Sequence, residues 1–374
     1  MASPTKTDKQ MSFQADFWNT ADKSLADGKV KGVSLFAGAG GMDVGFEAAG
    51  VHVVKANEIA PFACETYRAN HTQTQLLQGD VNDFINAFEK NEADIVFGGP
   101  PCQGFSVAGK MNPEDERSQL IWSFLNVVEK VQPKVFVMEN VKALAALEKW
   151  SGVREKYLQR ASELGYTCHF FVLNSADYGV CQKRERVFFI GSKTPFEREK
   201  LAAALEQGKV AAPTLRELFQ SLPPIGSEGN EHTCKAKITI AANPVMRRSP
   251  YAGMIFNGMG RPLNLDAVSS TLPASMGGNK TPIIDEELLQ NPNANDWVKE
   301  YHGKLWEKEI EPVFGEAPTR LRRISLTEAA AIQSFPRDYQ WRGQKSAIYT
   351  QIGNAVPCKL AEAVAKTVIK FFGL

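Results

Sequence analysis

A regular alternation of short apolar runs and helix-like segments constrains this chain more than any other feature. Apolar runs typical of buried strands recur at residues 32–36, 52–56, 74–77, 94–97 and 135–138. Helix-like segments lie between or after them, at 42–49, 60–70, 81–89, 117–131 and 153–164, followed by strand-like runs at 167–173 and 187–190. Strands that alternate with helices indicate a sheet covered on both faces. The sequence therefore predicts a Rossmann-like α/β domain with a mixed, mostly parallel sheet.

The composition of the sequence changes after residue 193. Residues 221–285 are rich in Gly, Pro, Ser and Asn, which predicts short strands and irregular backbone. Helices are expected again at residues 201–209, 325–334 and 358–372, and residues 347–351 lead into Pro357 before the last of them. We predict three parts: a polar N-terminal extension at 1–31, with a short helix at 13–25; a larger domain made of 32–193 and 345–374; and a smaller, loop-rich domain with a hinge at 194–344.

Composition narrows the classes of protein that fit. The chain of 374 residues has 43 Lys and Arg against 42 Asp and Glu, so its bulk charge does not indicate a nucleic-acid partner. The 6 cysteines form no Cys-x-x-Cys pair, so no metal site is expected, and their sparseness fits a reducing compartment. No apolar run approaches the ~20 residues that a membrane span needs. We therefore expect a cytoplasmic protein without metal or membrane.

A Gly-rich turn follows the first predicted strand and opens a helix at residues 36–41. Glycines let the backbone approach a ligand closely, and the helix start supplies free N–H groups. The last glycine of a dinucleotide fingerprint is replaced by Asp43, so the sequence does not support NAD. Glu58 and Asp80 end the next two strands, where they could accept from a ribose and an adenine amino group. The alternative is a tight turn with two surface acids.

A cysteine follows two prolines directly after the fourth predicted strand, in residues 98–106. Ligands of doubly wound sheets lie at the carboxyl ends of the strands, so Cys102 is expected at the active edge. A thiolate is the best side-chain nucleophile for carbon. The alternative is a buried structural cysteine.

The fifth strand and a later strand end in further polar groups. Glu139 could lie opposite Cys102 and bond the Watson–Crick edge of a base. The alternative is a helix N-terminus capped by Asn140. Arg184 and Arg186 alternate before another strand, so one face could grip a phosphate or a carbonyl oxygen. The alternative for them is a solvated charged edge.

These segments together resemble the DNA (cytosine-5) methyltransferase family. The motifs occur in the family's order, from residue 33 to residue 357. They are residues 35–41 (LFAGAGG), 99–106 (GPPCQGFS), 139–141 (ENV), 182–186 (QKRER), 323–328 (RISLTE) with 333–336 (QSFP), and 351–357 (QIGNAVP). Any one motif is moderately specific, whereas the ordered set is very specific.

The resemblance implies a Rossmann-like, S-adenosylmethionine-dependent domain and a target-recognition domain. The residues that it implies for the methyl donor are Phe36, Ala37, Gly38, Gly40, Gly41, Glu58, Ile59, Asp80, Val81, Pro101, Leu120, Asn354 and Ala355. Those that it implies for catalysis are Cys102, Glu139, Arg184 and Arg186. Candidate DNA contacts are Gln103, Ser106, Arg247, Arg248, Arg261, Thr271 and Lys280.

The reaction that the resemblance implies is methyl transfer to carbon 5 of a cytosine extruded from double-stranded DNA, through a covalent bond from Cys102 to carbon 6. The protein would be a monomer in the cytoplasm, associated with the nucleoid, and the modification half of a restriction–modification system with a companion endonuclease. One rival is a tRNA cytosine-5 methyltransferase of the same fold. The other is a catalytically inactive DNA-binding regulator, which the intact Cys102, Glu139, Arg184 and Arg186 disfavour.

Overall fold

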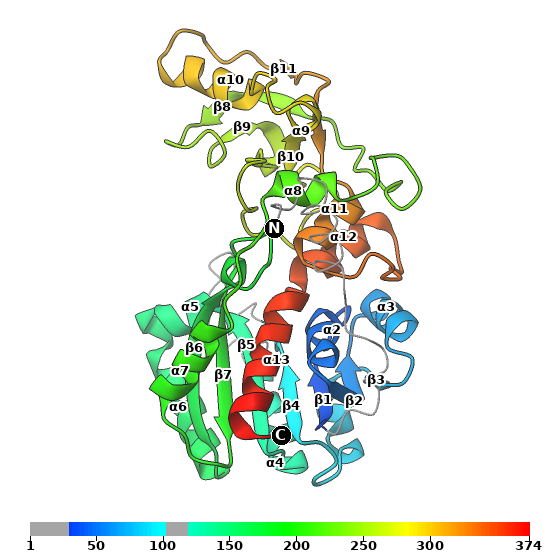
Figure 1. Ribbon diagram of the computed structural model, residues 1–374, viewed down its shortest axis with the longest axis vertical. Helices are drawn as coiled ribbons and strands as arrows, with labels where there is room; N and C mark the ends of the chain where they lie inside the picture. Colours follow the sequence, from blue (N-terminus) through cyan, green and yellow to red (C-terminus); the bar gives the residue numbers. More distant parts are fainter. Residues whose placement is uncertain (1–29, 102–118) are drawn as a thin grey trace, which may run out of the picture.

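The computed structural model describes residues 30–101 and 119–374 and divides them into a larger and a smaller part, one above the other (Figure 1). The helix expected at 13–25 and nearly all of the polar extension at 1–31 lie outside the described residues, as do Cys102, Gln103 and Ser106.

The larger part is built on a seven-stranded sheet. Its order is β3 (Gln75–Gln78), β2 (Val51–Glu58), β1 (Val30–Leu35), β4 (Ile95–Gly98), β5 (Val135–Val141), β7 (Glu185–Ser192) and β6 (Thr167–Asn174). The first five strands are parallel, whereas β7 runs antiparallel to both β5 and β6. This confirms the mixed, mostly parallel sheet. The chain order turns back between β1 and β4, which is where doubly wound sheets bind ligands.

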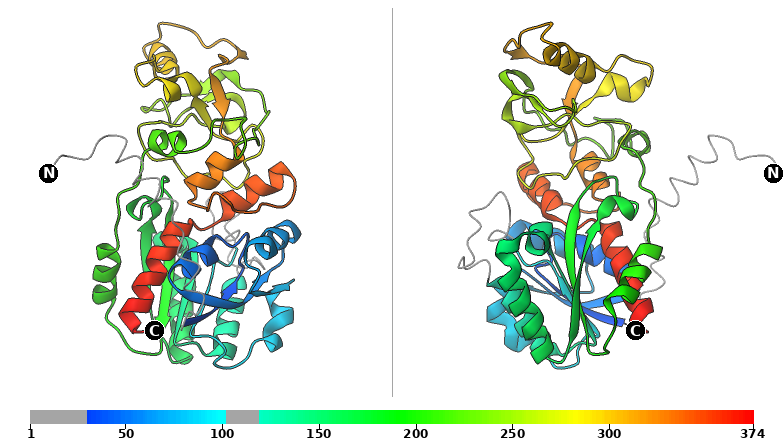
Figure 2. Two further views of the ribbon diagram at one scale, coloured as in Figure 1. Left: turned by 45° about the vertical axis from the view of Figure 1, so that its right-hand side comes forward. Right: turned by 90° about the vertical axis from the view of Figure 1, so that its left-hand side faces the viewer.

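Helices cover both faces of this sheet (Figure 2). One face packs against α2 (Gly41–Ala48), α7 (Arg198–Gln207) and α13 (Cys358–Phe372), and the other against α4 (Leu120–Val131) and α6 (Ser151–Glu163). α3 (Pro61–Asn70), α5 (Lys142–Ala146), η4 (Glu148–Trp150) and η5 (Ser175–Asp177) complete this part. The third expected helix, at 81–89, is a 3-10 helix, η2 (Val81–Ala87), whose start is capped by Asp80.

The smaller part consists of short elements joined by long loops, as the sequence predicts. Its sheets are β11 (Gly315–Glu316)–β8 (Thr239–Val245)–β9 (Met254–Phe256) and β10 (Ile283–Asp285)–β12 (Leu321–Arg323). Its helices are α8 (Leu215–Gln220), η6 (Asn257–Met259), α9 (Glu286–Gln290), α10 (Trp297–Trp306), α11 (Leu326–Ile332) and α12 (Lys345–Asn354). α12, which the sequence does not predict as a helix, shares an apolar core with α8 and α11. The division at residues 193 and 345 stays a prediction.

A single buried arginine organises the loops of the smaller part. The Arg323 guanidinium is 2% exposed and donates hydrogen bonds to four backbone carbonyls, those of Ala236, Lys237, Asn279 and Thr281. Burying a guanidinium is costly unless its donors are satisfied. Arg323 therefore satisfies backbone carbonyls in these loops that regular strand pairing would otherwise satisfy.

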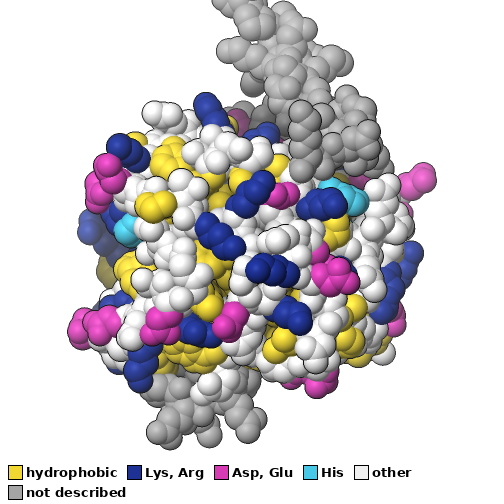
Figure 3. Space-filling model, turned by 90° about the horizontal axis from the view of Figure 1, so that it is seen from below, with side chains coloured by type: hydrophobic (Ala, Val, Ile, Leu, Met, Phe, Trp, Pro, Cys, Tyr) yellow, Lys and Arg dark blue, Asp and Glu magenta, His cyan; other side chains and the backbone are white. Residues whose placement is uncertain are grey.

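At the end of the molecule remote from the smaller part, the described surface does not form a face of one charge. Seen from that end, Lys and Arg side chains are interspersed with Asp and Glu (Figure 3). None of the described helices is both long and apolar enough to cross a membrane. The described residues also contain no group of His, Cys, Asp and Glu that could hold a metal ion.

Candidate active site

The carboxyl ends of β1, β2, β4 and β5 lie at one edge of the sheet because these strands are parallel. The edge faces the smaller part (Figure 1). Most of the described candidate residues of the larger part follow directly from these strand ends, so the sheet brings together segments that are far apart in the sequence.

The loop after β1 has an unusual backbone. Phe36, Gly38 and Gly40 have φ angles of 55°, 57° and 85°, in the left-handed region. A non-glycine residue rarely adopts that region, and strain of this kind clusters at functional sites. A Cβ atom on Gly38 would meet no other heavy atom within 4 Å, so the loop is open at this point. Phe36 is half-buried beside it.

Glu58, at the end of β2, holds the loop in this shape. Its side chain accepts hydrogen bonds from the backbone N–H groups of Gly38 at 2.7 Å, Ile59 at 2.8 Å and Ala60 at 2.7 Å. Glu58 is 8% exposed, whereas the neighbouring Ile59 is 61% exposed. The turn therefore combines a fixed carboxylate with an exposed apolar side chain.

The end of β3 adds a second carboxylate. Asp80 is exposed and accepts hydrogen bonds from the backbone and side-chain N–H groups of Asn82, at 2.8 and 2.9 Å. Val81 is 2% exposed and packs in the core, so only its backbone can face a ligand. The Asn57 side chain ties β2 to this turn through the carbonyls of Leu77 and Gly79, each at 3.0 Å.

The segment around Asn354 returns to the Gly-rich loop from the far end of the sequence. A Cβ atom on Gly41 would lie 2.7 Å from the carbonyl oxygen of Val356 and 3.1 Å from the Cβ atom of Ala355. Only a glycine permits this approach. Residues 355–356 therefore lie against the start of α2 and the end of the Gly-rich loop. The Asn354 side chain is exposed.

At the ends of β5 and β7, Glu139 and Arg186 form an ion pair, with the Arg186 Nε atom 2.9 Å from the Glu139 Oε1 atom. Glu139 is 8% exposed. Burial raises the pKa of its carboxyl above the usual value, against the opposing charges of Arg186 and Arg184. Gly99 leaves room for the carboxylate, because a Cβ atom there would lie 2.9 Å from Oε2. The acid is therefore buried next to β4 and held on one side only by its arginine.

Asn140 does not cap a helix, so that alternative is wrong. The helix α5 has Val141 as its N-cap, without a side-chain hydrogen bond. The Asn140 side chain instead donates to the carbonyl of Pro100 at 3.2 Å. Because β4 and β5 are neighbours, as the sequence predicts, this bond anchors the chain immediately before Cys102.

Arg184 is 3% exposed, so it does not lie on a solvated charged edge. Its guanidinium donates to the carbonyl of Asn354 at 3.3 Å. The two arginines therefore have different partners: Arg186 pairs with the acid of β5, and Arg184 joins the returning segment. Leu120 is half-buried at the start of α4, and Pro101 is half-buried at the last described position of its loop.

A buried amide pair, which sequence reasoning missed, supports this arrangement. The Gln182 side chain donates to the Gln333 side chain at 2.8 Å and accepts from the backbone N–H of Leu272 at 2.9 Å. Gln333 donates in turn to the carbonyls of Ile352 and Ala355. Both glutamines are 0% exposed. Apart from its place in a family-like motif, nothing in the sequence distinguishes Gln333 from a surface glutamine.

The candidate DNA contacts of the smaller part are all exposed, namely Arg247, Arg248, Arg261, Thr271 and Lys280. The segments of Arg261 and Lys280 are adjacent, because Gly260 donates to the carbonyl of Asn279 at 3.0 Å. The Thr271 hydroxyl donates to the carbonyl of Lys183 at 2.7 Å, next to Arg184. The structure joins Arg261 to Lys280 and Thr271 to the Arg184 segment, whereas Arg247 lies by α10 through a bond from its carbonyl to His302.

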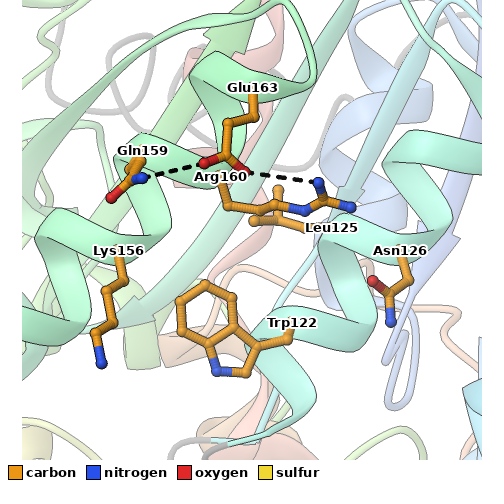
Figure 4. A pocket seen from close by; sticks show the side chains of 7 residues that line it. All are labelled: Trp122, Leu125, Asn126, Lys156, Gln159, Arg160 and Glu163. Atoms are coloured by element: carbon orange, nitrogen blue, oxygen red, sulfur yellow. Dashed lines mark hydrogen bonds and ion pairs between the residues drawn. The ribbon is translucent and has the colours of Figure 1, made fainter.

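A surface hollow between α4 and α6 does not belong to this site (Figure 4). Its lining includes Arg160 and Glu163, which form an ion pair within α6. None of the candidate residues lines the hollow.

Comparison with known proteins agrees with this geometry. The sequence model described as C-5 cytosine-specific DNA methylase matches residues 30–370. The type II methyltransferase M1.HphI of Haemophilus parahaemolyticus is 33% identical over 346 residues, which are 90% of this chain and 86% of that protein. M.NgoPII of Neisseria gonorrhoeae is 30% identical over 348 residues, covering 91% of this chain and 96% of that protein.

Solved structures share the fold. A DNA modification methyltransferase encoded within a prophage of E. coli has a TM-score of 0.64 at 23% identity, covering 92% of this chain and 100% of that one. The S. pombe Dnmt2 methyltransferase has a TM-score of 0.64 at 16% identity, with the same coverage. These comparisons confirm the resemblance and the α/β fold class expected from the sequence. The chain belongs to the C-5 cytosine-specific DNA methylase family.

Proposed function

We propose that this DNA (cytosine-5) methyltransferase transfers a methyl group from S-adenosylmethionine to carbon 5 of a flipped-out cytosine in a specific double-stranded DNA sequence, through a covalent bond from Cys102. The observation that carries the proposal is the convergence of three strand ends. The Glu139–Arg186 pair, the anchored Pro100 turn and the Gly-rich loop all lie at the carboxyl edge of β1, β4 and β5.

The residues of the Gly-rich loop fit a donor of this kind. The loop is open at Gly38, and an aromatic ring and an exposed apolar side chain, those of Phe36 and Ile59, lie near a fixed carboxylate at Glu58. Such groups suit a flat adenine and two ribose hydroxyls, and the exposed Asp80 can accept from an adenine amino group. The same pocket would be lined by backbone groups of the loops and by the segment that returns from the C-terminal part of the chain. These residues are Ala37, Gly40, Gly41, Val81, Asn354 and Ala355, with Pro101 and Leu120 at the opening of the pocket. The donor, when bound, supplies an electrophilic methyl group on a sulfonium.

Cys102 supplies the nucleophile that cytosine chemistry needs. Carbon 5 of the aromatic ring is a poor nucleophile, and addition of a thiolate to carbon 6 makes it enamine-like. Carbon 5 can then form its bond to the methyl carbon while the bond from that carbon to the sulfonium sulfur breaks, and the electron pair of the broken bond stays on the sulfur as a neutral thioether. A base, which we take to be water, removes the proton from carbon 5, and the electron pair of that bond expels the Cys102 thiolate. Atoms and charge balance, and the thiolate is regenerated.

Glu139 and the two arginines act on the ring and its backbone. The buried Glu139 carboxyl would bond N3 and the exocyclic amine, which stabilises the charge that develops on the ring. Arg184 and Arg186 would hold the O2 atom and the adjacent phosphate. The raised pKa of Glu139 favours the protonated form that can donate to N3.

The smaller part would read the DNA sequence. Arg247, Arg248, Arg261, Thr271 and Lys280 are exposed and carry the polar groups that contact phosphates or base edges. Gln103 and Ser106 would contact the backbone of the displaced nucleotide. In a specific complex, phosphate contacts position the protein and base contacts select the sequence.

The biological setting follows from the relatives, which carry the name type II methyltransferase. We infer that the protein is a cytoplasmic monomer that associates with the nucleoid and modifies the site of a companion restriction endonuclease. Membership of a DNA methylase family disfavours the tRNA alternative. The intact set of Cys102, Glu139, Arg184 and Arg186 disfavours the inactive regulator.

Covalent trapping tests the nucleophile. The protein is incubated with S-adenosylmethionine and duplex DNA that carries 5-fluorocytosine in place of cytosine. Fluorine cannot leave as a proton does, so the thioether to carbon 6 should persist and shift the protein on a denaturing gel. We expect this adduct for the native chain and its loss in Cys102→Ala.

The control is Cys234→Ala, which changes a partly buried cysteine of the smaller part. It should form the adduct as the native chain does. An adduct that survives Cys102→Ala would remove Cys102 from its role, and methylation of an exocyclic nitrogen would refute the reaction.

A further inference from the structure

A cluster of five polar side chains, four of them buried and one, Glu47, partly exposed, lies beneath the Gly-rich loop. Its members come from three parts of the chain: α2, α3 with the residue that follows it, and the segment between α11 and α12. They are Asp43, Glu47, Tyr67, His71 and Tyr339. None belongs to the motifs that relate the chain to its family, and none has a role in the mechanism above.

His71 connects the members of this cluster. Its Nδ1 atom lies 3.0 Å from both carboxylate oxygens of Glu47, and its Nε2 atom lies 3.1 Å from the hydroxyl of Tyr339. That hydroxyl also donates to the backbone carbonyl of Ala39, inside the Gly-rich loop. The His71 side chain is 1% exposed. A chain of hydrogen bonds thus runs from α2 through His71 to the loop.

The donors in this chain require that His71 carries two protons. The Tyr339 proton is used toward the Ala39 carbonyl, so the Tyr339 oxygen must accept from Nε2 of His71. The ionised Glu47 carboxylate can only accept, so Nδ1 must donate as well. His71 is therefore an imidazolium when all three bonds are made.

The charges around His71 agree with this assignment. Burial lowers the pKa of His71, but the hydrogen bond and charge of Glu47 and the charge of Asp43 outweigh it, so the pKa lies above 6.5. Tyr67 stacks on the imidazole at 4.3 Å and donates to Asp43 at 2.8 Å. Burial raises the pKa of Asp43 from 3.8 to about 6, and that of Tyr339 lies well above 10. The ionised groups facing His71 are thus acids, and both tyrosines stay protonated.

The Gly-rich loop fits closely onto His71 and Tyr339. A Cβ atom on Gly40 would lie 2.3 Å from Nε2 of His71 and 2.8 Å from the Tyr339 hydroxyl. The Gly40 N–H donates to Ala37, and the Gly38 N–H reaches Glu58. Movement of Tyr339 would therefore be transmitted through the Ala39 carbonyl to the part of the loop that Glu58 fixes.

We propose that doubly protonated His71 is a positioning residue for methyl-donor binding, because it orients Tyr339 so that the tyrosine hydroxyl fixes the Gly-rich loop at Ala39. The inference rests on the proposed use of S-adenosylmethionine by this loop. It adds that the segment of Tyr339, which leads from the smaller part back to the sheet, takes part in forming the donor pocket.

The test is equilibrium binding of S-adenosylmethionine to the full chain without DNA, measured by calorimetry at several pH values. Tyr339→Phe removes only the hydroxyl and keeps the ring that packs on Phe335 and Trp341. Losing a hydrogen bond to a charged group should weaken donor affinity about tenfold. His71→Gln should weaken it similarly, and the double variant should lose no more than the stronger single variant.

The pH profile separates positioning from a general loss of stability. Native affinity should fall as the pH rises through the pKa of His71, because a neutral imidazole cannot donate from both nitrogens. The affinity of Tyr339→Phe should not show this fall with rising pH. The matched control is Tyr251→Phe, which removes a hydroxyl that bonds the carboxylate of Asp296 in the smaller part. It should bind the donor as the native chain does.

Two failures are distinguishable. If the native chain binds no S-adenosylmethionine, the proposed cofactor is wrong. If the native chain binds it and Tyr339→Phe binds equally well with the same pH profile, the role of His71 and Tyr339 is refuted while the cofactor stands.

Discussion

Glu139 illustrates how one residue is prepared for chemistry by its surroundings. Its carboxyl is buried, which disfavours the charged form, and it has an arginine on one side, which favours that form. Burial is the larger effect, so the pKa lies above that of a free glutamate. The contact with Arg186 orients the carboxyl through one oxygen, and the raised pKa makes it easier to protonate this group for donation to the target base than a free glutamate.

Replacing Glu139 by glutamine should remove this proton donor. We expect Glu139→Gln to slow single-turnover methyl transfer by about 10² to 10⁴, the usual contribution of a positioned acid or base. In the native chain the rate should fall as the pH rises through the raised pKa, since only the acid form donates to N3. The variant should lose that alkaline limb.

Methyl transfer from labelled donor to duplex DNA, followed from acid to alkaline pH, measures both effects. Glu163→Gln, on the outer surface of α6, is the control and should behave as the native chain does. A variant with native rates at every pH would contradict the assignment of Glu139.

Among single residues, the sequence could single out those whose chemistry stands in a motif, such as Glu139 and Arg186, but it did not predict the ion pair that joins these two side chains. Asp43 was read only as a departure from the dinucleotide pattern. It is fully buried and bonds Tyr67, which comes from another helix. Such a partner depends on how α2 and α3 pack, which no local pattern contains.

At the scale of elements, α2 and α13 show how closely two helices can approach. α13 lies beside α2 (Figures 1 and 2). A Cβ atom on Gly45 would lie 2.4 Å from the carbonyl oxygen of Cys358 and 2.5 Å from the backbone nitrogen of Glu362. These atoms belong to the backbone and cannot turn away as a side chain can.

Gly45→Ala should therefore separate the two helices. We expect it to lower the free energy of unfolding by about 3 kcal/mol or more, at the upper end of the usual cost of overpacking. Donor binding should weaken too, because α2 begins at the Gly-rich loop. Urea denaturation measures the first effect and calorimetry the second.

Gly152→Ala in α6 is the matched control. A Cβ atom there meets nothing within 4 Å, so the alanine should be neutral or stabilise the protein by up to about 1 kcal/mol. Equal stabilities of the two variants would show that α2 and α13 can shift apart at no cost.

The spacing of apolar residues predicted the elements of the larger part well, because buried strands and amphipathic helices each have a characteristic local pattern of apolar residues. It could not distinguish the 3-10 helix η2 from an α-helix, since both have apolar residues three positions apart. α12 was not predicted as a helix, because its ends lie at polar residues, Lys345 and Asn354, and its buried face is set by contacts with α11.

At the scale of the whole molecule, the Gln182–Gln333 pair joins three segments. One leads into Arg184, one carries Leu272 of the smaller part, and one ends in Asn354. Because both amides are fully buried, each depends on the other to satisfy its polar atoms. The pair therefore couples the sheet edge that carries Arg184 to the loops of the smaller part.

Gln333→Leu should weaken this coupling. The change removes the hydrogen bond that the buried Gln182 amide donates to Gln333 and the bonds that Gln333 donates to the carbonyls of Ile352 and Ala355, which should cost about 1 to 3 kcal/mol. Gln207→Leu, on the exposed end of α7, should change stability by no more than about 0.5 kcal/mol. Urea denaturation of both variants is the measurement, and a smaller slope for Gln333→Leu would indicate that the two parts unfold separately.

Native stability and slope in Gln333→Leu would mean that the buried pair contributes nothing to the coupling.

The general arrangement, a large α/β part and a smaller loop-rich part, could be predicted from periodicity and composition. The contacts between the two parts could not be predicted in this way. Residues such as Gln182 and Leu272 are far apart in the sequence and come into contact only in the folded structure.

The close fit of α13 against Gly45, and of the segment just before α13 against Gly41, also has a consequence for synthesis. α13 is translated after every other described element, yet with the residues just before it α13 supplies the backbone against which α2 packs. Domains generally fold as units while the ribosome is still elongating the chain. A nascent polypeptide could form most of the sheet early but would lack a finished donor pocket until α13 had left the exit tunnel. Methylation by unfinished chains would thereby be avoided without any separate inhibitor.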